Sequence, residues 1–178
     1  MNAINASATA DAQQVWQWLH EVGDPEIPVI SVIDLGIVRD VAMAEDGECV
    51  VTITPTYSGC PAMLVIADAI GETLQKNGVQ RYRIETRLWP AWTTDWMSED
   101  GRRKLKEYGI APPVGRAVEH QVIDISALSR KRGAEPAIEC PRCGSFNTRL
   151  SSEFGSTSCK ALHVCNDCHE PFDYFKCH

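Results

Sequence analysis

Two pairs of cysteines near the C-terminus constrain the fold more than any other feature of the sequence. The pairs are Cys140-Pro-Arg-Cys143 and Cys165-Asn-Asp-Cys168, and 21 residues separate them. Each Cys-x-x-Cys can fold as a knuckle that directs two thiolates at one point, and two facing knuckles complete a tetrahedral site with four sulfur ligands. Gly144 directly follows the first pair and supplies the permissive backbone that such a turn favours. The spacing therefore predicts short β-hairpins around one metal site.

The segment resembles a zinc ribbon, and we expect Zn²⁺ as its cofactor. Four thiolates also suit iron or an iron–sulfur cluster, so both alternatives stay open from the sequence. A segment this short does not build a sufficient core unaided, which is a second reason to expect a structural metal. Cys159 and His163 share a strand face with Cys165. Because a closed structural site uses only four ligands, packing roles are favoured for these two residues.

Composition and charge bound the remaining possibilities. The chain has 178 residues, 44% of them hydrophobic, and a formal net charge of −7. No run approaches the roughly 20 apolar residues of a membrane helix, and an acidic chain is a poor general ligand for nucleic acid. Residues 1–11 lack the basic and apolar regions of a secretory signal. We therefore expect a cytoplasmic protein with reduced thiols and no membrane contact.

Hydrophobic periodicity and turn residues predict the architecture of the chain. Helices are expected over 10–22, 61–77 and 98–108, and strands over 37–44, 48–54, 81–89 and 117–125, with a hairpin turn at 45–47. The fold class is α+β: a small mixed α/β domain followed by the ribbon. The expected organisation is a flexible tail (1–9), the α/β domain (10–130), a linker (131–137) and the ribbon (138–178).

Cys60 is a candidate reactive thiol because of its position. Pro61 suits the first residue of a helix, which places Cys60 at or beside the N-cap. The helix dipole there is expected to lower the thiol pKa and to make the sulfur nucleophilic or able to bind metal. A small buried cap residue is an equally good interpretation from position alone. Glu26 and Asp34, together with Asp24, either gather near Cys60 or cap local turns.

Three tryptophans lie within eight residues: Trp89, Trp92 and Trp96. Such a cluster is either a lid over the core or a surface for a partner. Partner binding is favoured slightly, because a basic helix over 98–108 follows directly. A solvated helix face is the alternative for those basic residues.

The first half of the chain resembles the SufT-type iron–sulfur assembly domain. The matching motifs are Asp24-Pro-Glu-Ile-Pro28, Ser31-Val-Ile-Asp34-Leu-Gly-Ile-Val38 and Ser58-Gly-Cys60-Pro-Ala62. Further motifs resemble the PaaD family, a small subunit of the phenylacetyl-CoA epoxidase system: Trp92-Thr-Thr-Asp-Trp96, Tyr108-Gly-Ile-Ala-Pro-Pro113, Phe154-Gly-Ser-Thr157, Cys159-Lys160 and Glu170-Pro-Phe172.

The resemblance implies an accessory or maturation factor of aerobic phenylacetate degradation rather than an enzyme, with no catalytic residue assigned. Its partners would be the other epoxidase subunits, above all the iron–sulfur flavin reductase and the oxygenase, and a homodimer is left open. In the related domain the cysteine that matches Cys60 handles metal or sulfur, so a transient iron–sulfur species is implied there, and Asp34 would shape the same pocket. The ribbon would then recognise the client.

Two other functions remain as alternatives. The chain is an integral non-catalytic or electron-transfer subunit if the four cysteines hold redox-active iron. It is a nucleic-acid module if the ribbon acts like those of the transcription machinery, although the acidic charge and the absence of a basic stripe in the ribbon disfavour this function.

Overall fold

The computed structural model describes residues 10–114 and 137–177. These residues belong to two compact units, Met1–Trp92 and Thr93–His178. The expected tail (1–9), the expected strand over 117–125 and nearly all of the expected linker lie outside the described residues. The expected domain boundaries therefore stay predictions.

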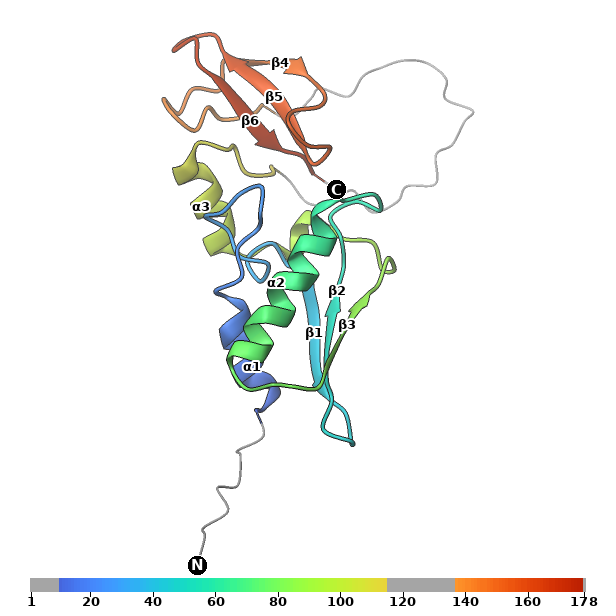
Figure 1. Ribbon diagram of the computed structural model, residues 1–178. Coiled ribbons are helices and arrows are strands. Elements are labelled where there is room, and N and C mark those ends of the chain that lie inside the picture. Colours follow the sequence, from blue (N-terminus) through green and yellow to red (C-terminus); the bar gives the residue numbers. More distant parts are fainter. Residues whose placement is uncertain (1–9, 115–136, 178) are drawn as a thin grey trace, which may run out of the picture. The chain divides into compact units, whose positions relative to one another are not determined.

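The first unit contains a three-stranded sheet with helices α1 (Ala12–Leu19) and α2 (Ala62–Lys76) (Figure 1). Strands β1 (Val38–Met43) and β2 (Cys49–Ile53) form an antiparallel hairpin, and β3 (Tyr82–Thr86) lies parallel to β2. Helix α2 is the crossover that this parallel pair requires. The sheet order is β1-β2-β3, which places β2 in the centre.

Local sequence signals explain these elements. Asp11 caps α1 by accepting a hydrogen bond from the Gln14 backbone at 2.7 Å, and the Gln14 side chain accepts one from the Asp11 backbone at 3.1 Å. Gly47 has a φ of 82° and supplies the left-handed residue of the predicted hairpin turn. Apolar residues at helical and strand spacing form one core, which includes Val15, Leu19, Ile37, Val51, Ile53, Ile66, Ile70 and Leu74.

The second unit contains a 3₁₀ turn η1 (Thr94–Trp96), helix α3 (Glu99–Tyr108) and a three-stranded antiparallel sheet. The strands are β4 (Thr148–Ser152), β5 (Lys160–Cys165) and β6 (Pro171–Phe175), in that order across the sheet. Ala111 adds a parallel bridge to the open edge of β6, where its N–H donates to the Asp173 carbonyl at 2.8 Å and its carbonyl accepts from the Phe175 N–H at 2.9 Å. This bridge joins the segment after α3 to the ribbon.

Most predicted elements are confirmed, with ends at most three residues shorter than expected. Helix α3 begins after the predicted cap Ser98, whose hydroxyl accepts from the Gly101 N–H at 2.9 Å, and it ends at Gly109 with a φ of 97°. The sequence did not predict β6 or the Ala111 bridge. Among residues 10–114 and 137–177, no helix combines the length and the apolar character that crossing a membrane requires.

Candidate functional site

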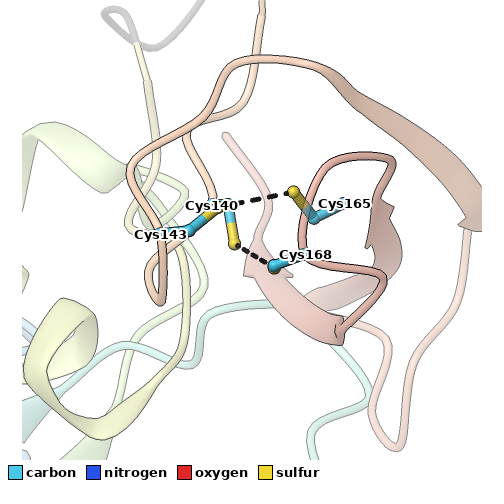
Figure 2. Close-up of side chains that lie close together, drawn as sticks. All are labelled: Cys140, Cys143, Cys165 and Cys168. Atoms are coloured by element: carbon cyan, nitrogen blue, oxygen red, sulfur yellow. Dashed lines mark hydrogen bonds between the residues drawn. The ribbon is translucent and has the colours of Figure 1, made fainter.

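The four predicted cysteines converge on one point in the second unit. Cys140 and Cys168 have their sulfurs 3.8 Å apart, and Cys143 and Cys165 theirs 3.6 Å apart. Figure 2 shows all four side chains pointing toward a common centre, and all four sulfurs lie within 4.8 Å of one another. A tetrahedral site with metal–sulfur bonds of about 2.3 Å has sulfur–sulfur edges of about 3.8 Å. The donor set and its spacing therefore fit one tetrahedral metal ion.

The backbone of each knuckle turns in the same way. Gly144 has a φ of 75°, and its N–H donates to the Cys140 carbonyl at 2.9 Å. His169 occupies the equivalent position after Cys168 and has a φ of 61°. A side chain at positive φ is costly, so the second knuckle is held in this shape by its surroundings. His169 is exposed and lies outside the cysteine cluster.

Polar side chains outside the cluster join the two knuckles to each other. Asp167 accepts hydrogen bonds from Ser145 and, at 2.8 Å, from the Asn147 side chain. The Asn166 side chain donates to the Asn147 side chain at 2.9 Å. These contacts set the distance between the knuckles and leave the sulfurs directed inward, as an outer shell does in metal sites.

The thiols do not titrate alike in the absence of metal. The backbone N–H of Cys168 donates to the Cys165 sulfur and, with the neighbouring thiols, lowers the pKa of Cys165 to about 7. The N–H of Ser145 has the same effect on Cys143, but desolvation and the other three thiols outweigh it and raise the pKa of Cys143 to about 12. All four sulfurs can be thiolates only with a cation among them, because the metal displaces the remaining protons and offsets the repulsion between the negative sulfurs.

The other candidate ligands of the ribbon pack instead. His163 stacks on Phe172 at a ring distance of 5.8 Å and meets the edge of Tyr174 at 5.5 Å. Cys159 is buried, and its sulfur lies 3.0 Å from the Thr157 hydroxyl. Within the described ranges, the four-cysteine cluster is the only group of three or more His, Cys, Asp or Glu side chains whose ligand atoms lie close enough to hold one metal ion.

Cys60 lies immediately before Pro61, the N-cap of α2, as the sequence indicated. The predicted lowering of its pKa is wrong. Burial raises the pKa of the Cys60 thiol, and the negative charges of Glu26 and Asp24 raise it further. Hydrogen bonds from the Ala62 N–H and the Tyr57 side chain act in the opposite direction and do not prevail. The thiol therefore stays protonated at neutral pH.

The acidic residues were expected either to lie near Cys60 or to cap local turns, and the structure supports each interpretation in part. One carboxylate oxygen of Asp24 accepts from the N–H groups of Glu26 and Ile27, each at 2.8 Å, which is a turn-stabilising role. Asp24 and Glu26 nevertheless act on Cys60 through their charge. Asp34 is buried in a reciprocal turn with Ser31, at 3.3 and 3.0 Å, and supports the same loop from within.

Tyr57 is a site residue that the sequence analysis missed. Its side chain hydrogen-bonds to the Cys60 thiol, and its carbonyl accepts from the Cys60 N–H at 3.1 Å. The available signal was the turn composition of Tyr57-Ser58-Gly59-Cys60, which brings residues three apart close together.

The three tryptophans have different environments. Trp92 is only 4% exposed, and its indole N–H donates to the Leu35 carbonyl at 2.9 Å, so it is a core residue and the expectation of partner contact is wrong for it. Trp89 is 79% exposed, and Trp96 is half-buried in η1. The structure leaves Trp89 as the tryptophan most accessible to another molecule.

The basic residues of α3 are engaged within their own unit. The Arg102 guanidinium donates to the carbonyls of Thr94 at 2.6 Å and Pro113 at 2.9 Å. The other three basic side chains form the ion pairs Arg103–Asp100, Arg103–Glu107, Lys104–Asp100 and Lys106–Glu139. These interactions offset the positive charge of α3 and weaken the support that the basic helix lent to partner or nucleic-acid binding.

Comparison with known proteins agrees with both units. Residues 12–79 match the family of iron–sulfur cluster assembly proteins, and residues 125–176 match the PaaD zinc beta ribbon domain. The chain is 45% identical over 177 residues to a putative 1,2-phenylacetyl-CoA epoxidase subunit of Escherichia coli, and the match covers 99% of each protein. It is 36% identical over 94 residues to an Fe-S protein maturation auxiliary factor of Porphyromonas gingivalis, covering 52% of this chain and 89% of the relative.

A solved structure shares the fold of the first unit. This domain of unknown function, DUF59, from Bacillus anthracis aligns with a TM-score of 0.50 and 28% identity, covering 53% of this chain and 90% of the other. The expected α+β fold with an assembly-type domain and a zinc ribbon is therefore confirmed.

Proposed function

The chain belongs to the family of the putative 1,2-phenylacetyl-CoA epoxidase subunit of Escherichia coli that it matches over its whole length, and on this basis we propose that it assists iron–sulfur or iron cofactor assembly in the other subunits of a phenylacetyl-CoA epoxidase system. The proposed process is aerobic phenylacetate degradation, and the proposed clients are the iron–sulfur flavin reductase and the oxygenase. A cytoplasmic location with reduced thiols belongs to the same proposal.

The observation that carries the proposal is the surroundings of Cys60. A half-buried thiol lies under the influence of two carboxylates, in the unit that matches the iron–sulfur assembly family. The negative charges of Glu26 and Asp24 would attract a cation toward Cys60, whose thiol would release its proton to solvent as a metal–sulfur bond forms. Because burial and the same carboxylates favour the protonated thiol, the sulfur releases the metal readily when a client offers better ligands. Weak, reversible holding suits a protein that delivers its metal.

The second unit has a separate role in this proposal. Zn²⁺ at Cys140, Cys143, Cys165 and Cys168 would join the two knuckles and stabilise the ribbon, since four thiolates around Zn²⁺ leave no open position for chemistry. The sulfur spacing of 3.6 and 3.8 Å supports a single ion rather than a cluster. Metal analysis of protein purified without oxygen separates zinc from iron. Stoichiometric iron with visible absorption would favour the electron-transfer alternative.

Co-expression tests the maturation role. The reductase and the oxygenase are produced with the wild-type chain, without it, with Cys60→Ser, and with Cys177→Ser as the matched control. Cys177 donates from its sulfur to the Val114 carbonyl at 3.2 Å, a bond that a serine hydroxyl can replace. We expect reduced iron content and a weaker cluster spectrum of the clients without the chain or with Cys60→Ser, and normal loading with Cys177→Ser. Equal loading in all four cases would refute the proposal.

A further inference from the structure

Four large apolar side chains of the first unit are exposed on the two segments that follow the carboxyl ends of strands β2 and β3. Leu64 (78% exposed) and Val65 (54%) lie in the first turn of α2, and Leu88 (58%) and Trp89 (79%) follow strand β3. Single exposed apolar residues are ordinary on a soluble protein, but a group of them marks an interaction surface.

The topology brings the two pairs to the same end of the unit. Strands β2 and β3 are parallel, so their carboxyl ends meet at one edge of the sheet, where the Arg87 N–H donates to the Ile53 carbonyl at 2.8 Å. The segment that leaves β2 carries Cys60 and then begins α2. The segment that leaves β3 carries Leu88 and Trp89. Figure 1 shows the start of α2 and the end of β3 at the same end of the unit.

The outer face of α2 changes from apolar to acidic along its length. Leu64, Asp68 and Glu72 are all exposed, and their spacing of four residues places them along one face. At 1.5 Å per residue, Asp68 lies about 6 Å and Glu72 about 12 Å along the axis from Leu64. The first unit as a whole contains 12 acidic and 5 basic residues, whereas the second contains 12 of each. The negative charge of the protein thus resides in the unit that carries Cys60.

We propose that Leu64, Val65, Leu88 and Trp89, together with the acidic residues Asp68 and Glu72, form a docking surface for the client protein. Its occupant is a client segment that places one large apolar side chain against Leu64 and Val65 at the start of α2, a lysine or arginine about 6–12 Å further along the helix, opposite Asp68 and Glu72, and a further apolar contact on the segment of Leu88 and Trp89. Docking there would place the client beside Cys60. The inference rests on the proposed function, because it names the chemistry of the partner that the Cys60 site would serve.

Photo-crosslinking of the full-length chain tests the surface. A benzophenone amino acid replaces Leu64 or Trp89, and the matched control carries it in place of Phe146, which is 60% exposed in the second unit. Each protein is mixed with purified reductase and oxygenase that were produced without the chain. We expect crosslinks from positions 64 and 89, but not from 146, to a client segment with an apolar residue close to lysine or arginine.

Charge reversal adds a second measurement. Each exposed ion pair contributes up to about a fivefold change in an equilibrium, so the double variant Asp68→Lys/Glu72→Lys should weaken the crosslink several-fold at low salt and little at high salt. Leu64→Glu should weaken it at any salt concentration. Far-UV circular dichroism verifies that these surface variants stay folded.

The outcomes separate the docking surface from the proposed function. Equal crosslinking from position 146 would overturn the docking proposal. A dimer in light scattering that Leu64→Glu abolishes would also overturn it, because the surface would then bind a second copy of the chain. If client loading depends on Cys60 but not on Leu64, Asp68 or Glu72, the docking surface is refuted and the maturation role stands. If loading needs no part of the chain while the crosslinks persist, the maturation role is refuted and the contact surface remains.

Discussion

Substitution of Trp92 by phenylalanine should loosen the loop that carries the acidic residues beside Cys60. The indole N–H donates to the Leu35 carbonyl at 2.9 Å, and both residues are almost completely buried. Leu35 ends the same loop in which Asp24 and Glu26 lie. Phenylalanine keeps an aromatic ring in the core but removes the donor, so the Leu35 carbonyl is left buried without this partner.

The expected loss of stability follows from that one bond. An unsatisfied buried polar group costs about 1–3 kcal/mol, which lowers the folded-to-unfolded ratio of the first unit roughly 5- to 150-fold. Urea unfolding followed by far-UV circular dichroism measures the loss, because fluorescence would change with the tryptophan itself. Trp89→Phe is the matched control, and its change should stay within about 0.5 kcal/mol, as for most surface substitutions.

A second readout connects the bond to the site. If the Leu35 contact holds the loop in place, Trp92→Phe should speed the alkylation of Cys60 at neutral pH, since the carboxylates that oppose thiolate formation would be less well positioned. Unchanged stability in Trp92→Phe, with a loss in Trp89→Phe, would refute the assignment of core and surface roles to these two tryptophans.

Three further outcomes are expected. Cys168→Ser should release the metal to a chelator and make the second unit sensitive to protease, because three thiolates no longer close the site; a metal-loaded, protease-resistant variant would contradict this. Alkylation of Cys60 should have its pH midpoint above that of an ordinary cysteine thiol, because burial and nearby carboxylates raise its pKa, and Glu26→Gln should lower the midpoint. A pKa raised in the folded state contributes stability that is complete below the pKa of the unfolded thiol and is lost as pH rises through the folded value. Urea titrations at neutral pH and at a pH above the alkylation midpoint would detect this loss. Gly71→Ala should destabilise α2 by about 1–3 kcal/mol, because its Cβ would lie 2.7 Å from the Tyr82 hydroxyl, and Tyr82→Ala should relieve the clash in a thermal melt.

Features set by neighbouring residues were predictable from the sequence. Ser98 and Gly109 mark the two ends of α3 because capping depends only on the adjacent turn. The two Cys-x-x-Cys pairs indicated the metal site for the same reason, because each knuckle is formed by neighbouring residues. Only the contact between the two knuckles depends on residues far apart in the sequence.

Features set by distant residues were not predictable in this way. The pKa of Cys60 is raised, whereas its position predicted a lowered one. The causes are the burial of the thiol and the charges of Glu26 and Asp24, which lie more than 30 residues earlier in the chain. Trp89 and Trp92 are chemically identical and three residues apart, yet packing against Leu35, 57 residues away, decides which is buried. Sequence periodicity carries no information about such contacts.

The bridge between Ala111 and β6 has a consequence for the order of synthesis. The chain leaves the ribosome N-terminus first, and the first unit is complete at Trp92. The segment after α3 pairs with β6 (Pro171–Phe175), which is synthesised much later than Ala111. The three-stranded ribbon and the Ala111 bridge can therefore form only after β6 has been made, so a nascent chain can fold its assembly-type domain before it has a complete ribbon.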